Sequence, residues 1–561
     1  MKRKSIIALF LLLSFIVPTS CELFESDSYD YNNNDPVTST NIVTAPAEPV
    51  QSYGYAPGTH DFSYETKQSY MIYYGILNDD IIEEAKQYEV VILHPKMGNI
   101  TREQVQEIRK SGTKVLGYIS IGEDLRTAYM TPEEMLKDSR FTGDKTGPRV
   151  DPRPEGTLSL DGVDPMGNPS SAGTGYASYY LDDNNHDGKP DINPIFNCAF
   201  TNIGDPAWFE VLDNMTMDGE DQIPGLKEIL SDDYGRALGC DGVFLDTIDT
   251  VAPNSYTDET SYNMTRFEWT ATGVKDFCAL LKNNYPDKLI LQNRGVFFYN
   301  PALPHYKYNP REYVDYVMYE SYHLDSNSDV LFYEGYSADN RYNFAPRLVA
   351  EASRLDGFQV LSLGYAEGPE EYHLKDTLFN NSEDGLEVLL EDMNIAEEAG
   401  FMHYITDGSV TMVNDFVIDH EETEDSAPPL WTSTYNDSLV FPPKPPTPRI
   451  GIQEAVPVKG GVTVRWDVAM DKNHVKYMLY YQTEPFDFEN DPSLSSALCK
   501  ELVPEVGDGY ENGVGENVYP NQDTLTGLTS GETYYFLIRA RDLSENANEE
   551  DNTVYLSAIP Q

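Results

Sequence analysis

The chain has 561 residues, and its 93 acidic residues against 39 basic ones give a formal net charge of -54 at pH 7. So negative a chain disfavours nucleic acids and anionic membrane surfaces as partners and would attract a cationic one, although solubility or a saline habitat accounts for the charge equally well. The length predicts two or three domains, because one core rarely serves more than about 300 residues.

The N-terminal segment resembles a secretory signal followed by a lipid anchor. Residues 1–20 combine a basic start, an apolar stretch and small residues before Cys21. This layout is similar to the lipobox of bacterial lipoproteins, although Pro18 stands where an aliphatic residue is usual. We therefore expect an extracytoplasmic protein held at a membrane or cell surface through lipidated Cys21, or else a secreted one. Residues 21–67 are polar, lack periodicity and predict a disordered tether.

Residues 68–425 contain eight short apolar runs that predict β-strands. Amphipathic segments between them, such as 101–112, 271–286 and 385–400, predict helices. Strands that alternate with helices imply right-handed crossovers and a parallel sheet, so we predict an α/β fold, a (β/α)8 TIM barrel. No GxGxxG follows the first strand to support a doubly wound dinucleotide fold. The runs span 70–76, 90–95, 114–122, 242–246, 289–293, 316–321, 359–366 and 402–407.

The interval 124–230 is too long for one crossover and predicts a large insertion at the catalytic face of the barrel. Inside it, oxygen-bearing side chains alternate before Gly188, a spacing that predicts a structural calcium loop. Pro194 stands where the terminal bidentate glutamate would be expected, so a polar turn is the alternative. The predicted ligands are Asp183, Asn185, Asp187 and Asp191.

The C-terminal part changes to an all-β pattern after a proline-rich linker, residues 426–447. Alternating strands within 448–561 predict a sandwich. The segment with Tyr534, together with Trp466, resembles a fibronectin type III domain and its tyrosine corner. Apart from Cys21, four cysteines lie in the chain without a close pair, which predicts neither a zinc site nor a dense disulfide framework and leaves one disulfide open.

Polar side chains stand at the predicted C-terminal ends of five barrel strands, where TIM barrels carry their catalytic groups. A single strand-end carboxylate most often caps a helix or turn, but several on one face favour a pair that divides acid and nucleophile roles. No HExxH, GxSxG or phosphate-binding glycine loop occurs, so we expect no cofactor for catalysis. The five residues are Glu123, Asp246, Asn293, Glu320 and Asp407.

Four sequence motifs, in this order along the chain, resemble those of a known enzyme family: GYISIGE with Glu123, GDPAWFEVL, GCDGVFLDTID with Asp246 and Asp249, and YVMYES with Glu320. Over residues 70–415 the chain resembles glycoside hydrolase family 114, the endo-α-1,4-polygalactosaminidases. The resemblance implies that Asp246 and Glu320 are the catalytic carboxylates.

On the basis of this resemblance, we expect an extracellular endo-glycosidase acting on α-linked galactosamine-containing exopolysaccharide, a cationic amino-sugar polymer. A glycosidase for another glycan and a non-catalytic carbohydrate-binding lipoprotein are the alternatives. Rings near the strand ends could stack on sugars. We expect Tyr74, Glu123, Asp249, Asn293 and Tyr365 to bind the substrate.

Overall fold

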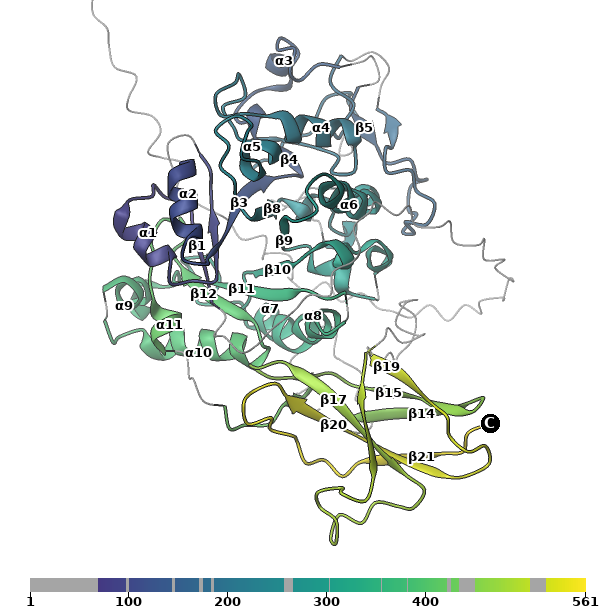
Figure 1. The fold of residues 1–561 in the computed structure, drawn as a ribbon. Coiled ribbons are helices and arrows are strands. Elements are labelled where there is room, and N and C mark those ends of the chain that lie inside the picture. Colours follow the sequence, from purple (N-terminus) through teal and green to yellow (C-terminus); the bar gives the residue numbers. More distant parts are fainter. Residues whose placement is uncertain are drawn as a thin grey trace, which may run out of the picture.

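The structure is a computed structural model whose described residues lie between 69 and 561 (Figure 1). The described ranges are 69–96, 100–143, 147–170, 175–182, 186–256, 266–301, 303–354, 356–380, 382–420, 425–432, 450–504 and 521–561. The predicted signal, the tether with Cys21 and residues 433–447 of the linker lie outside them. Within these ranges, no helix combines the length and apolarity needed to cross a membrane.

Eight parallel strands form one sheet that wraps into a barrel, which confirms the expected fold class. Each strand pairs with the next along the chain, and Tyr74 N donates to Val410 O at 2.7 Å where the first and last strands meet. The strands are β1 Tyr70–Tyr73, β2 Val90–Leu93, β3 Lys114–Ser120, β8 Gly242–Asp246, β9 Leu289–Asn293, β10 Tyr316–Glu320, β11 Gln359–Tyr365 and β12 Met402–Thr406.

Most of the longer helices lie between successive barrel strands, as the sequence periodicity predicts. Helix α2 begins with a capping box, because Thr101 and Gln104 each accept the other's backbone N–H through their side chains. The helices outside the insertion are α1 Asp79–Ala85, α2 Arg102–Arg109, α6 Val274–Asn284, α7 Glu334–Asp339, α8 Ala345–Ala352, α9 Leu374–Asn380, α10 Leu386–Glu398 and α11 Phe416–His420. Shorter 3₁₀ turns include η3 Ile248–Val251, η5 Glu268–Gly273 and η6 Val296–Tyr299.

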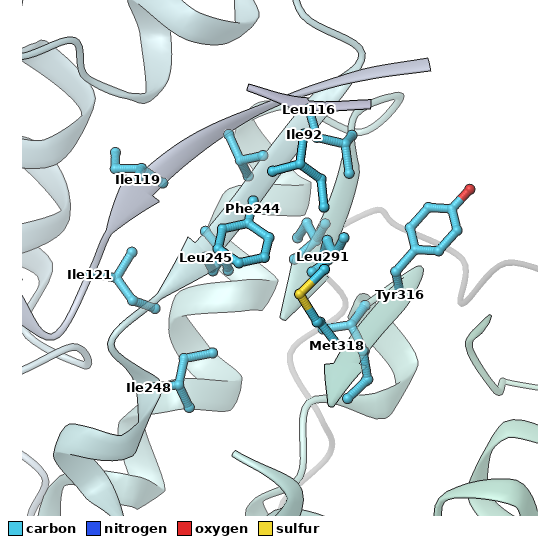
Figure 2. Close-up of a cluster of buried hydrophobic side chains, with 14 of the residues drawn as sticks. Ile92, Leu116, Ile119, Ile121, Phe244, Leu245, Ile248, Leu291, Tyr316 and Met318 are labelled. Atoms are coloured by element: carbon cyan, nitrogen blue, oxygen red, sulfur yellow. The ribbon is translucent and has the colours of Figure 1, made fainter. Parts of the chain in front are cut away.

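A buried apolar cluster fills the space between the central strands. Figure 2 shows Leu116, Phe244, Leu291 and Met318 lying together, and all four are fully buried. Because side chains on a strand alternate between its two faces, the residue two positions further on each strand lies on the same face as this cluster. At the strand ends those residues are Tyr118, Asp246, Asn293 and Glu320.

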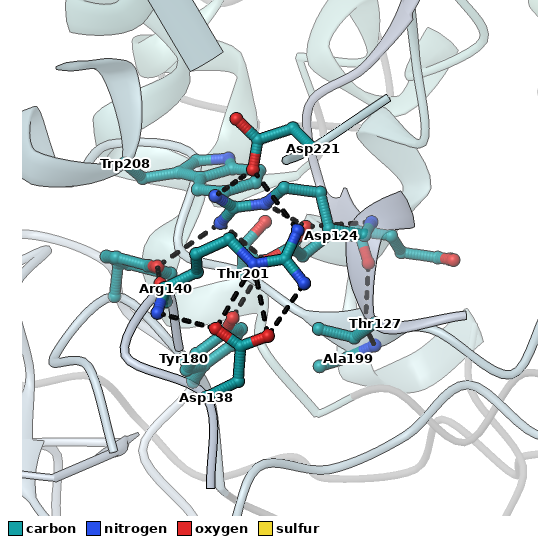
Figure 3. A network of polar contacts seen from close by, with 12 residues as sticks. Asp124, Thr127, Asp138, Arg140, Tyr180, Ala199, Thr201, Trp208 and Asp221 are labelled. Atoms are coloured by element: carbon teal, nitrogen blue, oxygen red, sulfur yellow. Dashed lines mark hydrogen bonds and ion pairs between the residues drawn. The ribbon is translucent and has the colours of Figure 1, made fainter. Parts of the chain in front are cut away.

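The interval between β3 and β8 forms a layer of short elements at the top of the view, beside β3 and β8 (Figure 1). A polar network holds it together (Figure 3). Fully buried Asp124 pairs with Arg126 at 2.8 Å and accepts a hydrogen bond from the Tyr180 hydroxyl at 2.7 Å. Trp208 Nε1 donates to Ile121 O at 2.7 Å, which ties the layer to the end of β3. Its elements are β4 Glu123–Asp124, α3 Pro132–Met135, β5 Arg149–Val150, β6 Asn168–Pro169, β7 Ala199–Phe200, α4 Pro206–Asn214 and α5 Leu226–Leu230.

The C-terminal residues form two antiparallel sheets, with strand orders β14-β15-β19 and β18-β17-β20-β21. Fully buried Trp466 and Tyr477 pack edge to face between them. Val468 and Met470 belong to the same apolar cluster as the barrel core, so the two domains share an apolar contact. The strands are β13 Leu430–Trp431, β14 Ile452–Val458, β15 Gly461–Trp466, β16 Ala469–Met470, β17 Val475–Gln482, β18 Leu498–Leu502, β19 Asn521–Thr526, β20 Tyr534–Asp542 and β21 Tyr555–Ala558.

The four cysteines of the described residues are free thiols. Cys198, Cys240 and Cys278 are buried, whereas Cys499 is exposed. The structure therefore contains no disulfide among them.

Candidate active site

Asp246 and Glu320 meet at the C-terminal end of the barrel across one shared hydrogen-bond donor. The Asn293 Nδ2 atom donates to Asp246 Oδ1 at 2.9 Å and to Glu320 Oε2 at 2.7 Å. Strand β9, which ends at Asn293, lies between β8 and β10, so the amide is held between the two acids. Among the described residues, the buried Oδ1 atom of Asn293 has no hydrogen-bond partner, and it can accept from a hydroxyl or amine donor.

A tyrosine holds the second oxygen of each acid. The Tyr118 hydroxyl donates to Asp246 Oδ2 at 2.7 Å, and the Tyr365 hydroxyl donates to Glu320 Oε1. Burial raises the pKa of both phenols well above the usual value, so they stay protonated and keep donating. Each carboxyl group is thereby fixed at both of its oxygen atoms.

The two acids differ in their electrostatic surroundings. Burial raises the pKa of Glu320, and the negative charge of Asp246 raises it further. The Tyr365 hydroxyl, the Arg294 guanidinium and the Asn293 amide oppose this rise without cancelling it. These surroundings therefore favour the protonated form of Glu320.

The backbone turns sharply directly after two of these residues. Thr247, which follows Asp246, has φ of 66°, and Arg294, which follows Asn293, has φ of 59°. A β-branched residue in the left-handed region is strained, and such strain concentrates at functional sites. The Thr247 hydroxyl accepts from Gly122 N at 2.7 Å, which fixes the turn against the end of β3.

Glu123 lies in the wall of this site. It is 4 % exposed and accepts a hydrogen bond from Asn193 Nδ2 at 2.7 Å, whereas its buried Oε2 atom has no partner among the residues that the structure describes. A small cavity of about 20 Å³, room for roughly one water molecule, lies between Glu123, His94, Tyr118 and Trp208. Burial raises the pKa of Glu123 to about 8, and the charge of Asp246 adds to the rise.

This burial predicts that Glu123 lowers the stability of the fold as pH rises. Below about pH 4 the side chain is protonated in both states, but between about pH 4 and 8 only the unfolded chain ionises. Glu123→Gln, which does not titrate, should therefore gain up to roughly 4 kcal/mol over the wild type by pH 8 and almost nothing at pH 4. Thermal unfolding of both proteins across this range measures the difference.

Glu228→Gln is the matched control for that measurement. Glu228, in helix α5, is also fully buried, but its two carboxylate oxygens accept backbone N–H bonds from Met217 and Arg236, each at 2.7 Å. Its amide variant should be less stable than the wild type at neutral pH. A pH-independent difference between Glu123→Gln and the wild type would contradict the neutral, buried acid.

The other predicted substrate-binding residues lie around the same centre. The Tyr74 ring packs edge-on against His94 and Tyr118, with ring centroids 5.2 and 5.5 Å apart. Asp249 instead pairs with the Arg294 side chain at 2.5 Å. Asp407, also at a strand end, accepts backbone N–H bonds from Ser409 and Thr411 and closes the turn after β12.

The predicted calcium loop is described only in part. Asp183 and Asn185 lie outside the described residues. Asp187 Oδ1 accepts from Lys189 N at 3.0 Å, and Asp191 N donates to Leu181 O at 2.8 Å. The neighbouring Asp182 accepts from Gly188 N at 2.7 Å, and its other, buried carboxylate oxygen has no partner in the described part of the chain.

In the described part of the chain, one other group of acids could share a cation. Asp425, Asp471 and Asp542 lie with carboxylate oxygens within 4.8 Å of one another. Amide groups already donate to them: Asn473 Nδ2 to Asp425 at 2.7 Å and Asn548 Nδ2 to Asp542 at 2.8 Å. The group therefore has hydrogen-bond partners without a metal.

Sequence reasoning missed Arg294 and Asn193. Arg294 directly follows the strand-end residue Asn293, so its position alone could have drawn attention to it. Asn193 lies 70 residues after Glu123 along the chain, inside the insertion, and no local pattern joins the two. Contacts made by insertions become visible only in the fold.

No protein-family model matches the chain, and no curated protein matches it. Among solved structures, it is similar to the glycoside hydrolase domain of a PelA variant from Pseudomonas aeruginosa, with 15% identity, a TM-score of 0.37 and coverage of 62% of this chain and 97% of that one. Aspergillus fumigatus Ega3 in complex with galactosamine shows 13% identity and a TM-score of 0.32, with coverage of 62% and 92%. Bacillus licheniformis trehalose-6-phosphate hydrolase shows 12% identity and a TM-score of 0.33, with coverage of 61% and 64%. Likeness at this level carries no argument about activity.

Proposed function

We propose that the protein is a glycoside hydrolase that cleaves its substrate with retention of configuration, with Asp246 as the nucleophile and Glu320 as the acid and then the base. The observation that carries this proposal is the single Asn293 nitrogen that contacts both carboxyl groups. The two hydrogens of an amide nitrogen diverge by about 120°, so the bonded oxygens lie about 5 Å apart. That spacing is typical of retaining enzymes, whereas inverting ones leave roughly 6.5–9.5 Å for a water molecule.

The surroundings of the acids match these two roles. Glu320, whose proton is favoured by burial, gives that proton to the glycosidic oxygen as the bond to the anomeric carbon breaks. An Asp246 oxygen bonds to the same carbon and forms a glycosyl ester. Glu320 then removes a proton from water, which displaces Asp246 and leaves both side chains as they began. Tyr118 and Asn293 hold Asp246 in place throughout.

The proposed substrate is an α-linked, galactosamine-containing exopolysaccharide, cleaved internally. The proposal takes the polymer from the resemblance of the sequence blocks to glycoside hydrolase family 114. Free amines on such a polymer are cationic and hydrogen-bond donating, and the site contains the Asp246 carboxylate together with the buried Asn293 Oδ1 acceptor. Acceptors and negative charge in a cleft favour a cationic, hydroxyl-rich ligand.

Incubation with a panel of purified exopolysaccharides tests this proposal. Mass spectrometry should detect soluble oligosaccharides from galactosamine polymers, and NMR of the first products should show the anomeric configuration of the substrate. Products from a different glycan would change the proposed substrate but would still support a glycosidase. Binding to a polysaccharide without any release of products would favour a non-catalytic surface protein.

Location and the C-terminal domain complete the proposal. We infer an extracytoplasmic protein anchored through lipidated Cys21, with the C-terminal sandwich as a fibronectin type III-like spacer. Replacing Cys21 by serine should release the protein from the membrane fraction. A native protein found only in the soluble fraction would contradict the anchor.

A structural calcium ion in the loop 183–191 is also proposed. The spacing of the sequence supports it, as does the unpartnered oxygen of fully buried Asp182 next to the loop. Chelator should lower the melting temperature and added calcium should restore it, because a ligand that binds only the folded state stabilises that state. Asp183→Ala should remove this response. Identical melting curves with chelator and with saturating calcium would rule the site out.

A further inference from the structure

Asp249 and Arg294 form an ion pair beside the two proposed catalytic acids. Arg294 Nε donates to Asp249 Oδ2 at 2.5 Å, and Gly295 N donates to Oδ1 at 3.3 Å. On the premise of the function proposed above, we propose that Asp249 is a positioning residue for Glu320. The Asp249 carboxylate binds the Arg294 guanidinium and offsets part of its positive charge. This weakens the electrostatic effect of Arg294 on Glu320, the side chain that donates the proton.

The backbone brings Arg294 to the end of the strand that carries Glu320. Arg294 follows Asn293, whose amide contacts Glu320 at 2.7 Å, and Arg294 N donates to Met318 O at 2.9 Å. Met318 precedes Glu320 by two residues. Since the Arg294 side chain starts at this point, the position taken by its guanidinium decides how much positive charge Glu320 experiences.

The ion pair is exposed enough for that position to change. The side chains of Arg294 and Asp249 are 25 % and 26 % exposed, so neither is locked inside the core. Ion pairs of this exposure contribute little to stability. The Asp249–Arg294 pair therefore contributes little to folding stability. Its electrostatic effect on Glu320 is the larger consequence.

Glu320 faces five charged and titratable groups, which come from four strands or their ends. Asp246 comes from β8, Arg294 from the end of β9, Tyr365 from β11, and Tyr70 and Tyr74 from β1 and its end. Arg294 is the one cation of this set, and it lowers the pKa of Glu320 against the rise caused by burial and by Asp246. The Asp249 carboxylate offsets part of the Arg294 charge, which helps Glu320 to remain an acid.

Three variants test the inference through the alkaline limb of the pH profile of kcat/KM. In Asp249→Asn, Arg294 loses the negative charge of Asp249 and favours ionised Glu320 more strongly, so the limb should move down by about one pH unit. In Arg294→Gln the cation is lost and the limb should move up. The double variant, with neither charge, should return close to the wild type. Asp241→Asn is the control, because it breaks an ion pair of like exposure with Arg109 at the other end of β8.

A substrate-free measurement separates this inference from the function on which it rests. Carbon-13 NMR of glutamate-labelled protein, with the Glu320 signal assigned through Glu320→Gln, should show its pKa fall in Asp249→Asn and rise in Arg294→Gln. If both variants lose thermal stability but leave the pKa and the alkaline limb unchanged, the ion pair is only structural and the inference is wrong. Absence of any glycan hydrolysis by the wild type would overturn the proposed function, while the NMR titration would still decide the role of Asp249. If Asp249→Asn does not fold, Arg294→Gln alone decides it.

Discussion

Asp246→Asn should lower kcat by at least about a thousandfold, because an amide cannot attack the anomeric carbon and hold it as an ester. The variant should fold normally, since asparagine has the same size and its one side-chain oxygen, Oδ1, can still accept the Tyr118 hydrogen bond. Initial rates on a verified polysaccharide, together with thermal unfolding, measure both effects.

Azide distinguishes a lost nucleophile from a distorted site. In Asp246→Ala the small anion can occupy the space of the missing carboxylate and attack the same face of the sugar, with Glu320 still protonating the leaving oxygen. We expect a glycosyl azide of inverted configuration. Asp241→Asn, at the opposite end of β8, should keep its activity and form no azide product. Near-native hydrolysis by Asp246→Asn would show that another residue is the nucleophile.

The barrel could be predicted because each strand is a short run buried on both faces between helical segments. All eight runs became strands, from Tyr70–Tyr73 to Met402–Thr406. The acids could be predicted for a related reason, since a carboxylate that ends a buried strand is costly unless it has a function or a partner. Asp407 also follows a buried strand, but its carboxylate only closes a turn. Position at a strand end therefore does not by itself distinguish a catalytic acid from a structural one.

Contacts across the site could not be predicted. Asn293 was expected near a sugar, but its bond to both carboxyl groups depends on strand β9 lying between β8 and β10 and on the alternation of faces that continues from Leu291. Asn193, which donates to the Glu123 side chain, comes from an insertion without periodicity. Local pattern fixes which face a residue occupies, whereas charge compensation between residues far apart in sequence depends on the completed fold.

Glu320→Gln should slow hydrolysis of the polysaccharide by about a hundredfold to ten-thousandfold, which is the usual contribution of a general acid and base. The glutamine cannot protonate the glycosidic oxygen or remove a proton from water. The loss of rate in Glu320→Gln should depend on the leaving group. An aryl glycoside with an acidic phenol needs no protonation, so the glycosyl ester should still form quickly. Because its hydrolysis needs the missing base, the ester should accumulate. Intact-protein mass spectrometry after rapid quenching measures the trapped ester as one added glycosyl unit.

The alkaline limb supplies an independent check on the same residue. Burial and Asp246 raise the pKa of Glu320, so wild-type kcat/KM should fall only at a pH above the ordinary range of a glutamate, and Glu320→Gln should lack this fall. Tyr365→Phe is the matched control, because it removes the hydroxyl that donates to Glu320 Oε1 but keeps the ring. Since that bond lowers the pKa of Glu320, its loss should move the limb upwards. An unaltered pH profile and equal losses for every leaving group in Glu320→Gln would assign the acid to another carboxyl group, and Glu123 would be the next to test.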